Sequence, residues 1–284
     1  MSDYHSKIIE YFNSTENAYR DAWNLNQSMA MHYGYWDKTV KSFHESLQKM
    51  NAVVAETAKI SANDRVLDAG CGVGGTSIYI AKNLGAQLVG ITLTPRQAEK
   101  AKQFAQKHGV TDKTEFHAMS YLKTDFPDNS FDAVIGLESI CYADNKEQFI
   151  REAYRVLKPG GRLVVADGYA AKEENNNNPA LRKVIDGWGL NYLETPERFS
   201  NYMQKAGFEE VSFRDITDAI DKSSKRIYRF YFLARVYLLY RKLTLRYNTT
   251  PVQLASIVAA KHQRASFKNR IMLYGIVAGV KPNH

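Results

Sequence analysis

A glycine-rich turn places the strongest constraint on how this chain folds. Residues 66–81 read VLDAGCGVGGTSIYIA, in which Gly70, Gly72, Gly74 and Gly75 separate an apolar run from a segment with helical spacing. Glycine lets the backbone turn tightly and approach a ligand, and the N-terminus of the following helix offers amide groups and the positive end of its dipole. The turn therefore predicts a strand–turn–helix unit that binds a ligand through its backbone.

Strands and helices are expected to alternate along the chain. The predicted strands are 65–70, 87–92, 114–119, 131–137, 161–168, 209–217 and 273–282. Helices are predicted between them, one opening at Pro95 and stopping at Gly109, and one starting at Asn145 and closed by Pro159 and Gly160. This pattern is typical of an α/β fold with a doubly wound, parallel, Rossmann-like sheet of seven strands.

Charge is distributed unevenly along the chain. The net charge is +8, but residues 221–270 contain twelve Lys and Arg against one acid, so the remainder sums to about −3. Apolar residues at helical spacing predict that this segment is a helical insertion between the last two strands. Its basic face either meets nucleic acid, a membrane surface or an acidic substrate, or is a solvated helix face.

The cysteines and the first residues bear on the cellular compartment. Cys71 and Cys141 have neither C-x-x-C nor metal-ligand spacing, so we expect reduced thiols and no metal site. The first residues, MSDYHSKIIEYFN, lack the apolar core of a signal peptide, and no apolar run is long enough to span a bilayer. We therefore expect a cytoplasmic protein.

The glycines alone do not decide which ligand the turn binds. The G-x-G-x-x-G pattern from Gly70 also matches the dinucleotide fingerprint, which needs an acid about 20 residues later for the ribose. That position falls near Thr92 with no acid close by, which weakens an NAD site and leaves an NADP site with Arg96 as an alternative. Asp68, at the end of the first strand, is placed to fix the loop amides or face a ligand ammonium group, or it only caps the turn.

Three segments together resemble the class I S-adenosylmethionine (SAM) dependent methyltransferases. They are VLDAGCGVGG, DNSFDAVIGLES and YRVLKPGGRLVVAD, and the resemblance covers about residues 60–170. It implies a Rossmann-like fold, SAM as the cofactor, and an enzyme that transfers methyl groups.

The segment GITLTPRQ, residues 90–97, resembles the branch of sterol and tocopherol methyltransferases and cyclopropane fatty-acid type enzymes. The resemblance implies that Thr92 and Gln97 replace the missing acid at the ribose hydroxyls, since each side chain can donate and accept; otherwise Gln97 is an ordinary helix residue. Ser120 stands where many relatives carry an Asp near the adenine, with Tyr121 beside it. The implied donor contacts are Tyr33, Asp68, Gly70, Cys71, Gly72, Gly74, Thr92, Leu93, Gln97, Ser120, Tyr121 and Glu138.

Glu138 is the main candidate for the chemistry. It follows the strand 131–137, and ligands of such sheets bind where the strands end. Its segment LESICYADN resembles that of sterol and terpene C-methyltransferases, which carry E-[SA]-x-x-[HY] here. In those enzymes an alkene takes the methyl group and leaves a carbocation, which implies Glu138 as base and cation stabiliser, with Tyr142 as its partner. The alternative is that Glu138 only hydrogen-bonds its loop.

The segment MHYGYWD, residues 31–37, resembles the lid of the same branch. It offers Tyr33 as a contact to the donor carboxylate or the reaction pocket, and His32 as a second candidate base. The implied domains are an N-terminal helical lid (1–50), a SAM-binding core (51–220), a basic, aromatic helical insertion acting as a substrate lid (221–270), and the last core strand (271–284).

Aromatic residues in and before the insertion favour a bulky, lipophilic acceptor. They are Trp188, Tyr192, Tyr228, Phe230, Tyr231, Phe232, Tyr237 and Tyr240. We expect C-methylation of an isoprenoid-type lipid (sterol, prenylated ring or terpene), with the basic face on an anionic membrane or a prenyl diphosphate. The alternatives are N- or O-methylation of an amine or phenol, RNA binding or methylation, and NADP-dependent oxidoreduction. No RNA-reading motif is present, so we expect no nucleic-acid partner, and the oligomeric state is left open.

Overall fold

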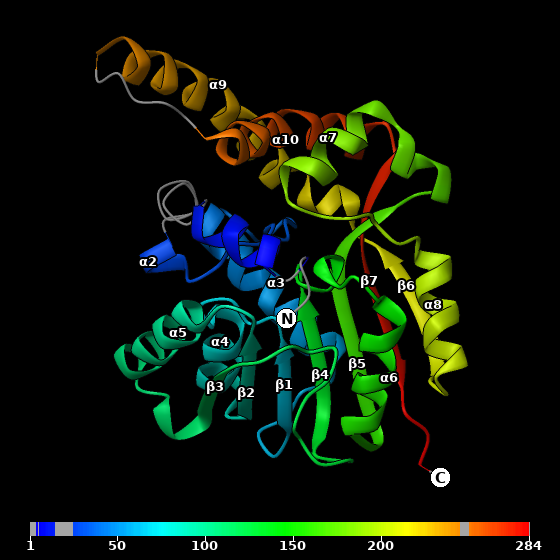
Figure 1. Ribbon diagram of the computed structural model, residues 1–284. Helices are drawn as coiled ribbons and strands as arrows, with labels where there is room; N and C mark the ends of the chain where they lie inside the picture. Colours follow the sequence, from blue (N-terminus) through cyan, green and yellow to red (C-terminus); the bar gives the residue numbers. More distant parts are fainter. Residues whose placement is uncertain (1–3, 5, 15–24, 245–249, 284) are drawn as a thin grey trace.

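A mixed seven-stranded sheet forms the centre of the molecule, with helices on both of its faces (Figure 1). The computed structural model describes residues 4, 6–14, 25–244 and 250–283. The strand order is β3-β2-β1-β4-β5-β7-β6. The strands are β1 (Arg65–Ala69), β2 (Gln87–Thr92), β3 (Thr114–Ala118), β4 (Phe131–Leu137), β5 (Leu157–Ala170), β6 (Glu209–Asp215) and β7 (Met272–Val280). This topology confirms the predicted Rossmann-like fold class.

Strand β7 runs antiparallel to both of its neighbours, β5 and β6, so the prediction of an all-parallel sheet is wrong at this strand. The connection explains the difference. Helix α10 ends at Lys268, above the carboxyl edge of the sheet, and β7 begins at Met272, so the chain re-enters the sheet at that edge (Figure 1). The antiparallel register pairs Tyr274 with Gly168, near the end of β5.

The helices alternate with the strands as predicted. The labelled helices are α2 (Leu25–Ser28), α3 (Phe43–Thr57), α4 (Gly75–Leu84), α5 (Pro95–His108), α6 (Lys146–Val156), α7 (Pro179–Gly187), α8 (Pro196–Lys205), α9 (Asp221–Thr244) and α10 (Pro251–Lys268). Residues 6–14 are also helical. Helix α5 opens at Pro95 and stops at Gly109, which has a left-handed φ of 68°, as the sequence predicted.

Helix α6 is shorter than predicted. It ends at Val156 instead of running to Pro159, and Leu157 already pairs with Phe131 in the sheet. Proline disfavours helical backbone at the residue before it, so Lys158 is extended and the strand starts early. The correction lengthens β5 but leaves the carboxyl edge of the sheet unchanged.

Helix α3 passes through residue 50, where the N-terminal lid was expected to end. Its buried side chains Met50, Val53 and Val54 pack in the same apolar cluster as α4 and the sheet. The helix is therefore continuous across that boundary, and the domain limits of the sequence stay predictions.

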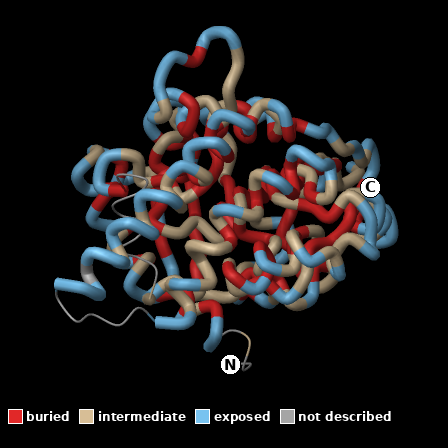
Figure 2. The backbone as a smooth tube through the Cα atoms, turned by 90° about the horizontal axis from the view of Figure 1, so that it is seen from above, coloured by how far each residue is buried: buried red, intermediate tan, exposed pale blue. Residues whose placement is uncertain are grey.

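Two apolar clusters fill the space between the sheet and its two helical layers. Figure 2 shows the buried backbone gathered at the centre of the molecule and the exposed backbone at its periphery. Burial of these side chains is the main term that stabilises the fold, and it fixes the strand ends that carry the site.

The predicted insertion consists of α9 and α10. Helix α10 packs against α7 and α9, while α9 projects beyond the body of the molecule (Figure 1). Among the described helices, none combines the length and apolar character that crossing a bilayer would require.

Candidate active site

A cavity of about 610 Å³ lies over the carboxyl ends of β1, β2, β4 and β5. Its described lining comes from these strand ends, from residues 29–33, and from α9 and α10. Open α/β sheets bind ligands at this edge, where strand ends and helix N-termini converge. The cavity joins the glycine-rich turn to the helical insertion.

The glycine-rich turn has the backbone geometry that the sequence predicted. Gly70, Gly72 and Gly74 have φ values of 93°, 53° and 85°, which L side chains rarely adopt. A Cβ at Gly70 would lie 2.3 Å from the Cβ of Ser139, so this position has no room for a side chain. Gly70 and Gly72 line the cavity, whereas a Cβ at Gly74 would meet the ring of Phe116 at 2.9 Å. The turn therefore offers backbone to a ligand.

Thr92 and Gln97 meet at the end of β2. The Thr92 hydroxyl donates to Gln97 Oε1 at 2.7 Å, and both side chains line the cavity beside Leu93 and Cys71. The backbone amide of Gln97 donates to the carbonyl of Thr94, which is the N-cap of α5. Gln97 therefore lies in the first turn of that helix, next to the end of β2. The structure thus brings the predicted pair together, and their role at a ribose stays a prediction.

The two residues predicted near the adenine lie in different places. Tyr121 is buried, lines the cavity and donates its hydroxyl to the carbonyl of Ser139 at 2.9 Å. Ser120 is outside the described cavity lining, and its hydroxyl accepts the amide of Leu122 at 3.2 Å. That local bond closes the turn after β3, and the role of Ser120 at the adenine stays a prediction.

Glu138 has a strained backbone and a well-defined side chain. Its φ is 50°, a left-handed value that is rare for a residue other than glycine. Its Oε1 accepts the backbone amide of Tyr33 at 2.6 Å and the hydroxyl of Tyr274 at 2.7 Å. Burial raises the pKa of Glu138 to about 8, with a contribution from nearby Asp167 and against the two hydrogen bonds. A carboxyl with this pKa is suited to exchange a proton near neutral pH.

Three acids line the cavity, and no Lys or Arg of the described residues lines it. Besides Glu138 they are Asp68 and Asp167. Asp68 accepts the hydroxyl of Ser77 at 2.6 Å, and burial raises its pKa to about 6. Asp167 accepts the amide of Cys141 at 2.8 Å, and burial raises its pKa as well. The cavity therefore favours cationic or neutral ligands over anions.

His32 and Tyr33 both line the cavity. His32 Nδ1 is 2.9 Å from the carbonyl of Tyr33, and burial lowers the pKa of His32 to about 4. The Tyr33 hydroxyl donates to Gln263 Oε1 of α10 at 2.9 Å. Of the two predicted bases, Glu138 has the higher pKa, so its ionised form is the stronger base. Tyr33 binds Glu138 through its backbone and anchors the lid segment through its hydroxyl.

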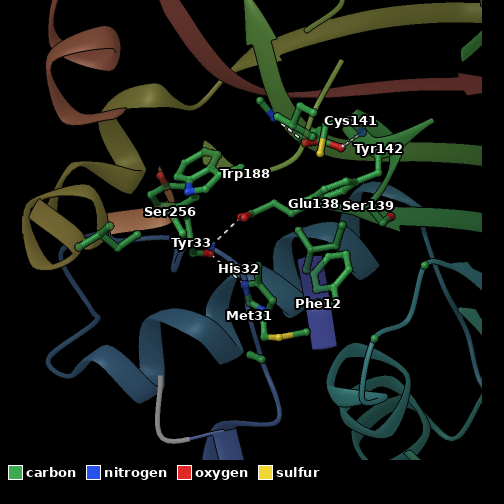
Figure 3. A pocket seen from close by; sticks show the side chains of 18 of the residues that line it. Phe12, Met31, His32, Tyr33, Glu138, Ser139, Cys141, Tyr142, Trp188 and Ser256 are labelled. Atoms are coloured by element: carbon green, nitrogen blue, oxygen red, sulfur yellow. Dashed lines mark hydrogen bonds between the residues drawn. The ribbon is translucent and has the colours of Figure 1, made fainter. Parts of the chain in front are cut away.

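An aromatic wall stands beside Glu138. The ring of Tyr142 lies 5.2 Å from that of Phe12 and 6.4 Å from that of Tyr11, both in the first helical segment. Figure 3 shows the Glu138 side chain reaching toward Tyr33, with Trp188 and Phe12 near it. Negative ring faces at such positions can stabilise a cation.

The sequence offered no signal for Tyr274. Its hydroxyl binds Glu138 across 136 residues of chain. The segment LYGIVAGVKP reads only as a strand, and the contact arises because β7 inserts beside β5. Only correct pairing of the last strand could have revealed it.

Comparison with known proteins agrees with this geometry. A family model described as a methyltransferase domain matches residues 67–165. The sterol 24-C-methyltransferase of Saccharomyces cerevisiae is 30% identical over 226 residues, covering 78% of this chain and 58% of that protein. The 27-O-demethylrifamycin SV methyltransferase of Amycolatopsis mediterranei is 30% identical over 188 residues, covering 66% of this chain and 69% of that protein.

A solved structure shares the fold across nearly the whole chain. It is geranyl diphosphate C-methyltransferase from Streptomyces coelicolor A3(2), in complex with Mg²⁺, geranyl diphosphate and S-adenosyl-L-homocysteine. The TM-score is 0.76 at 17% identity, and the match covers 99% of this chain and 98% of that one. By contrast, the chain spans 58% to 60% of the length of the sterol methyltransferases that it matches.

The fold and the strand-edge cavity define a class I methyltransferase architecture. The chain belongs to the methyltransferase family, and it is similar to the sterol C-methyltransferases over part of their length. This membership confirms the predicted enzyme class. The predicted cofactor is confirmed as well, since solved methyltransferases of this fold hold S-adenosyl-L-methionine or S-adenosyl-L-homocysteine.

Proposed function

We propose that this protein transfers a methyl group from SAM to a carbon of a neutral, lipophilic, isoprenoid-type acceptor such as a sterol, prenylated ring or terpene. The observation that carries the proposal is Glu138, a buried carboxyl with a pKa of about 8 in a cavity whose charged groups are acids. The cavity continues from the glycine-rich turn past Glu138 to α9 and α10, so one space holds donor and acceptor.

The chain's residues fit the donor. Asp68 and the turn at Gly70–Gly75 suit its amino-acid end, and the bonded pair Thr92 and Gln97 suits its ribose. When bound, SAM supplies an electrophilic methyl group on a positively charged sulfur. The acids of the cavity favour that charge, which in turn lowers the pKa of Glu138 toward the ionised form.

Glu138 then acts on the acceptor. The new carbon–carbon bond uses the π electrons of an alkene while the methyl–sulfur bond breaks and its electron pair stays on sulfur, which leaves a positive charge on the neighbouring carbon of the acceptor. The rings of Tyr142, Phe12 and Trp188 stabilise that charge, and ionised Glu138 removes the adjacent proton, which restores a double bond. Two hydrogen bonds, from Tyr33 and Tyr274, hold the carboxylate in position.

The charge of the cavity argues for an acceptor without a diphosphate. Each unit of negative charge about 6 Å from a carboxylate would cost about 3 kcal/mol at an effective dielectric constant near 20. Asp68 and Asp167 would contribute, as would Glu138 in its ionised form, and no Lys or Arg in the described lining offsets them. The basic residues of the insertion therefore serve a purpose outside the cavity.

O-methylation of a large lipophilic alcohol or phenol is the second candidate. It is favoured by the likeness to 27-O-demethylrifamycin SV methyltransferase. Glu138 would then remove the hydroxyl proton before or during transfer, so both candidates use the same base.

Labelled methyl transfer distinguishes these functions. The enzyme is incubated with methyl-labelled SAM and, in parallel, a sterol with a side-chain alkene, geranyl diphosphate, and a lipophilic phenol, and the products are located by mass spectrometry. We expect label on carbon in the neutral alkene. Label only on the phenol oxygen would support the second candidate, and label only in geranyl diphosphate would contradict the neutral acceptor.

A further inference from the structure

The outer half of α9, residues 232–244, exposes an unusual run of large apolar side chains. Of the exposed large apolar side chains in the described residues, all but Leu84 lie on α9 or at the start of α10. They are Phe232, Leu233, Val236, Tyr237, Leu239, Tyr240, Leu243 and Leu254. Single exposed apolar residues are ordinary, but a contiguous group marks a contact surface.

The spacing of these side chains gives the surface a direction. Phe232, Val236, Leu239 and Leu243 recur at intervals of four, three and four residues, which places them along one face of the helix. Val236 is 69% exposed and Leu243 is 74% exposed, so no described part of the chain covers this face. We call residues 232–244 the outer α9 segment.

This apolar surface is continuous with the mouth of the cavity. Leu233 and Tyr237 are 63% and 56% exposed, yet both line the cavity. Ser256 and Ile257 of α10 line it from the other side. A lipophilic molecule can therefore pass between the outer surface and the cavity along side chains of α9 and α10.

Basic residues surround the apolar side chains. Arg229, Arg235 and Lys242 of α9 are exposed, and residues 221–270 carry twelve Lys and Arg against one acid. Two copies of so basic a surface would repel each other, whereas an anionic surface would attract it. Apolar side chains with interspersed Lys and Arg are the composition of helices that lie in a membrane interface.

We propose that the outer α9 segment docks on an anionic lipid surface, and that the acceptor reaches the cavity from that surface between α9 and α10. The docking is inferred only from the exposed apolar side chains and the positive charge of the Lys and Arg around them. The route of the acceptor also depends on the proposed function. The proposal also gives the basic residues of the insertion a role outside the cavity, whose charged side chains are acids.

Vesicle co-sedimentation of the full chain tests the docking. Vesicles of phosphatidylcholine with phosphatidylserine are compared with vesicles of phosphatidylcholine alone. We expect partition onto the mixed vesicles to be at least about tenfold stronger, and to weaken as salt is raised. Equal partition onto both vesicle types, or none onto either, would overturn the proposal.

A double variant, Leu239→Glu with Leu243→Glu, tests the surface itself. Neither side chain lines the cavity, so SAM binding by calorimetry should be unchanged and reports an intact fold. We expect the partition coefficient to fall at least about tenfold. Leu84→Glu is the control, because it makes the same kind of substitution, with one added negative charge instead of two, at the exposed apolar residue away from the insertion, and its partition should stay near wild type.

The remaining outcomes separate docking from other partners and from the proposed function. Sedimentation velocity tests whether a second copy of the chain covers this surface instead. A wild-type dimer that is lost in the double variant and does not bind vesicles would overturn the proposal. With an alkene acceptor, transfer from vesicles should fall in the double variant while transfer from detergent micelles is kept. If the double variant lost no more transfer from vesicles than from micelles, the proposed route of the acceptor would be overturned. Vesicle binding without transfer to any acceptor would leave docking supported and contradict the proposed function.

Discussion

The two halves of the cavity are built in different ways. The half that we propose for the donor depends on the ends of β1 and β2, where the glycine-rich turn and the pair Thr92 and Gln97 belong to neighbouring segments of the chain. The half that we propose for the acceptor gathers residues 29–33, Glu138, α9, α10 and Tyr274 from the whole length of the chain. The first half depends on a local sequence motif, whereas the second half is formed by tertiary packing. A fold of this kind can therefore change its acceptor without disturbing its donor site.

The largest effect should come from Glu138→Gln, which removes the base but keeps the shape of the side chain. We expect kcat for an alkene acceptor to fall about 10³-fold, in the range ascribed to general bases, with SAM affinity within about threefold of wild type. Mass spectrometry of the product measures kcat, and calorimetry measures the affinity for SAM. Glu174→Gln, an exposed site, is the matched control.

The stability of the same variant shows whether a loss of rate reflects unfolding. Because the pKa of Glu138 is raised to about 8, the stability it contributes is present below pH 4.5 and is lost as pH rises through about 8. Glu138→Gln removes that loss, so its free energy of unfolding in urea at pH 8.5 should equal or exceed that of wild type. A marked drop there would attribute the lost activity to structure instead of chemistry.

Tyr274→Phe should give a smaller and pH-dependent loss. The Tyr274 hydroxyl stabilises the ionised form of Glu138, so its removal should raise the pKa of Glu138 further. We expect about a tenfold lower rate at pH 7 that recovers at higher pH, measured as a shift of the pH–rate profile. Tyr79→Phe, outside the cavity lining, should leave the profile in place. A loss that is equal at all pH values would argue against this contact as the cause.

The same contrast explains what the sequence could predict. Local signals were enough for the glycine-rich turn and for the start of α5 at Pro95, because each depends on a few neighbouring residues. The pairing of Thr92 with Gln97 followed from the family resemblance, and the structure brings the two side chains together. The antiparallel β7 and the contact of Tyr274 with Glu138 were out of reach, because they depend on where α10 returns the chain to the sheet.

Some errors came from local competition between structures. Lys158 looked helical by its apolar neighbours, but Pro159 and pairing with β4 made it extended. Ser120 was assigned to the adenine by its position in the sequence, and this role stays a prediction, because the structure shows only that its hydroxyl accepts the amide of Leu122. The acids of the cavity were visible as single residues, yet their shared environment and raised pKa values depend on burial that only the fold provides.

Thr92→Val and Gln97→Ala sharpen the account of the donor half. Each removes one member of the bonded pair, and each should weaken SAM binding about fivefold, the effect of losing about 1 kcal/mol of hydrogen bonding. Calorimetric titration measures this, with Gln106→Ala on the exposed face of α5 as the matched control. Unchanged affinity in both variants would remove the pair from the donor site.

Ser120→Ala should have the smallest effect. Because Ser120 lies outside the described cavity lining, SAM affinity should stay within about twofold of wild type, and any change should appear as a small loss of stability. A drop in affinity of tenfold or more would place Ser120 in the donor site after all.

The pH dependence of kcat/KM tests the central claim most directly, namely that a buried, ionised Glu138 takes the proton from the acceptor. Measured for the acceptor at saturating SAM, activity should rise with pH as Glu138 ionises, through a midpoint at or below about 8 because bound SAM lowers the pKa of Glu138, and Glu138→Gln should abolish this rise. A wild-type profile that is flat between pH 6 and about 9, or a rise that survives in Glu138→Gln, would contradict the claim.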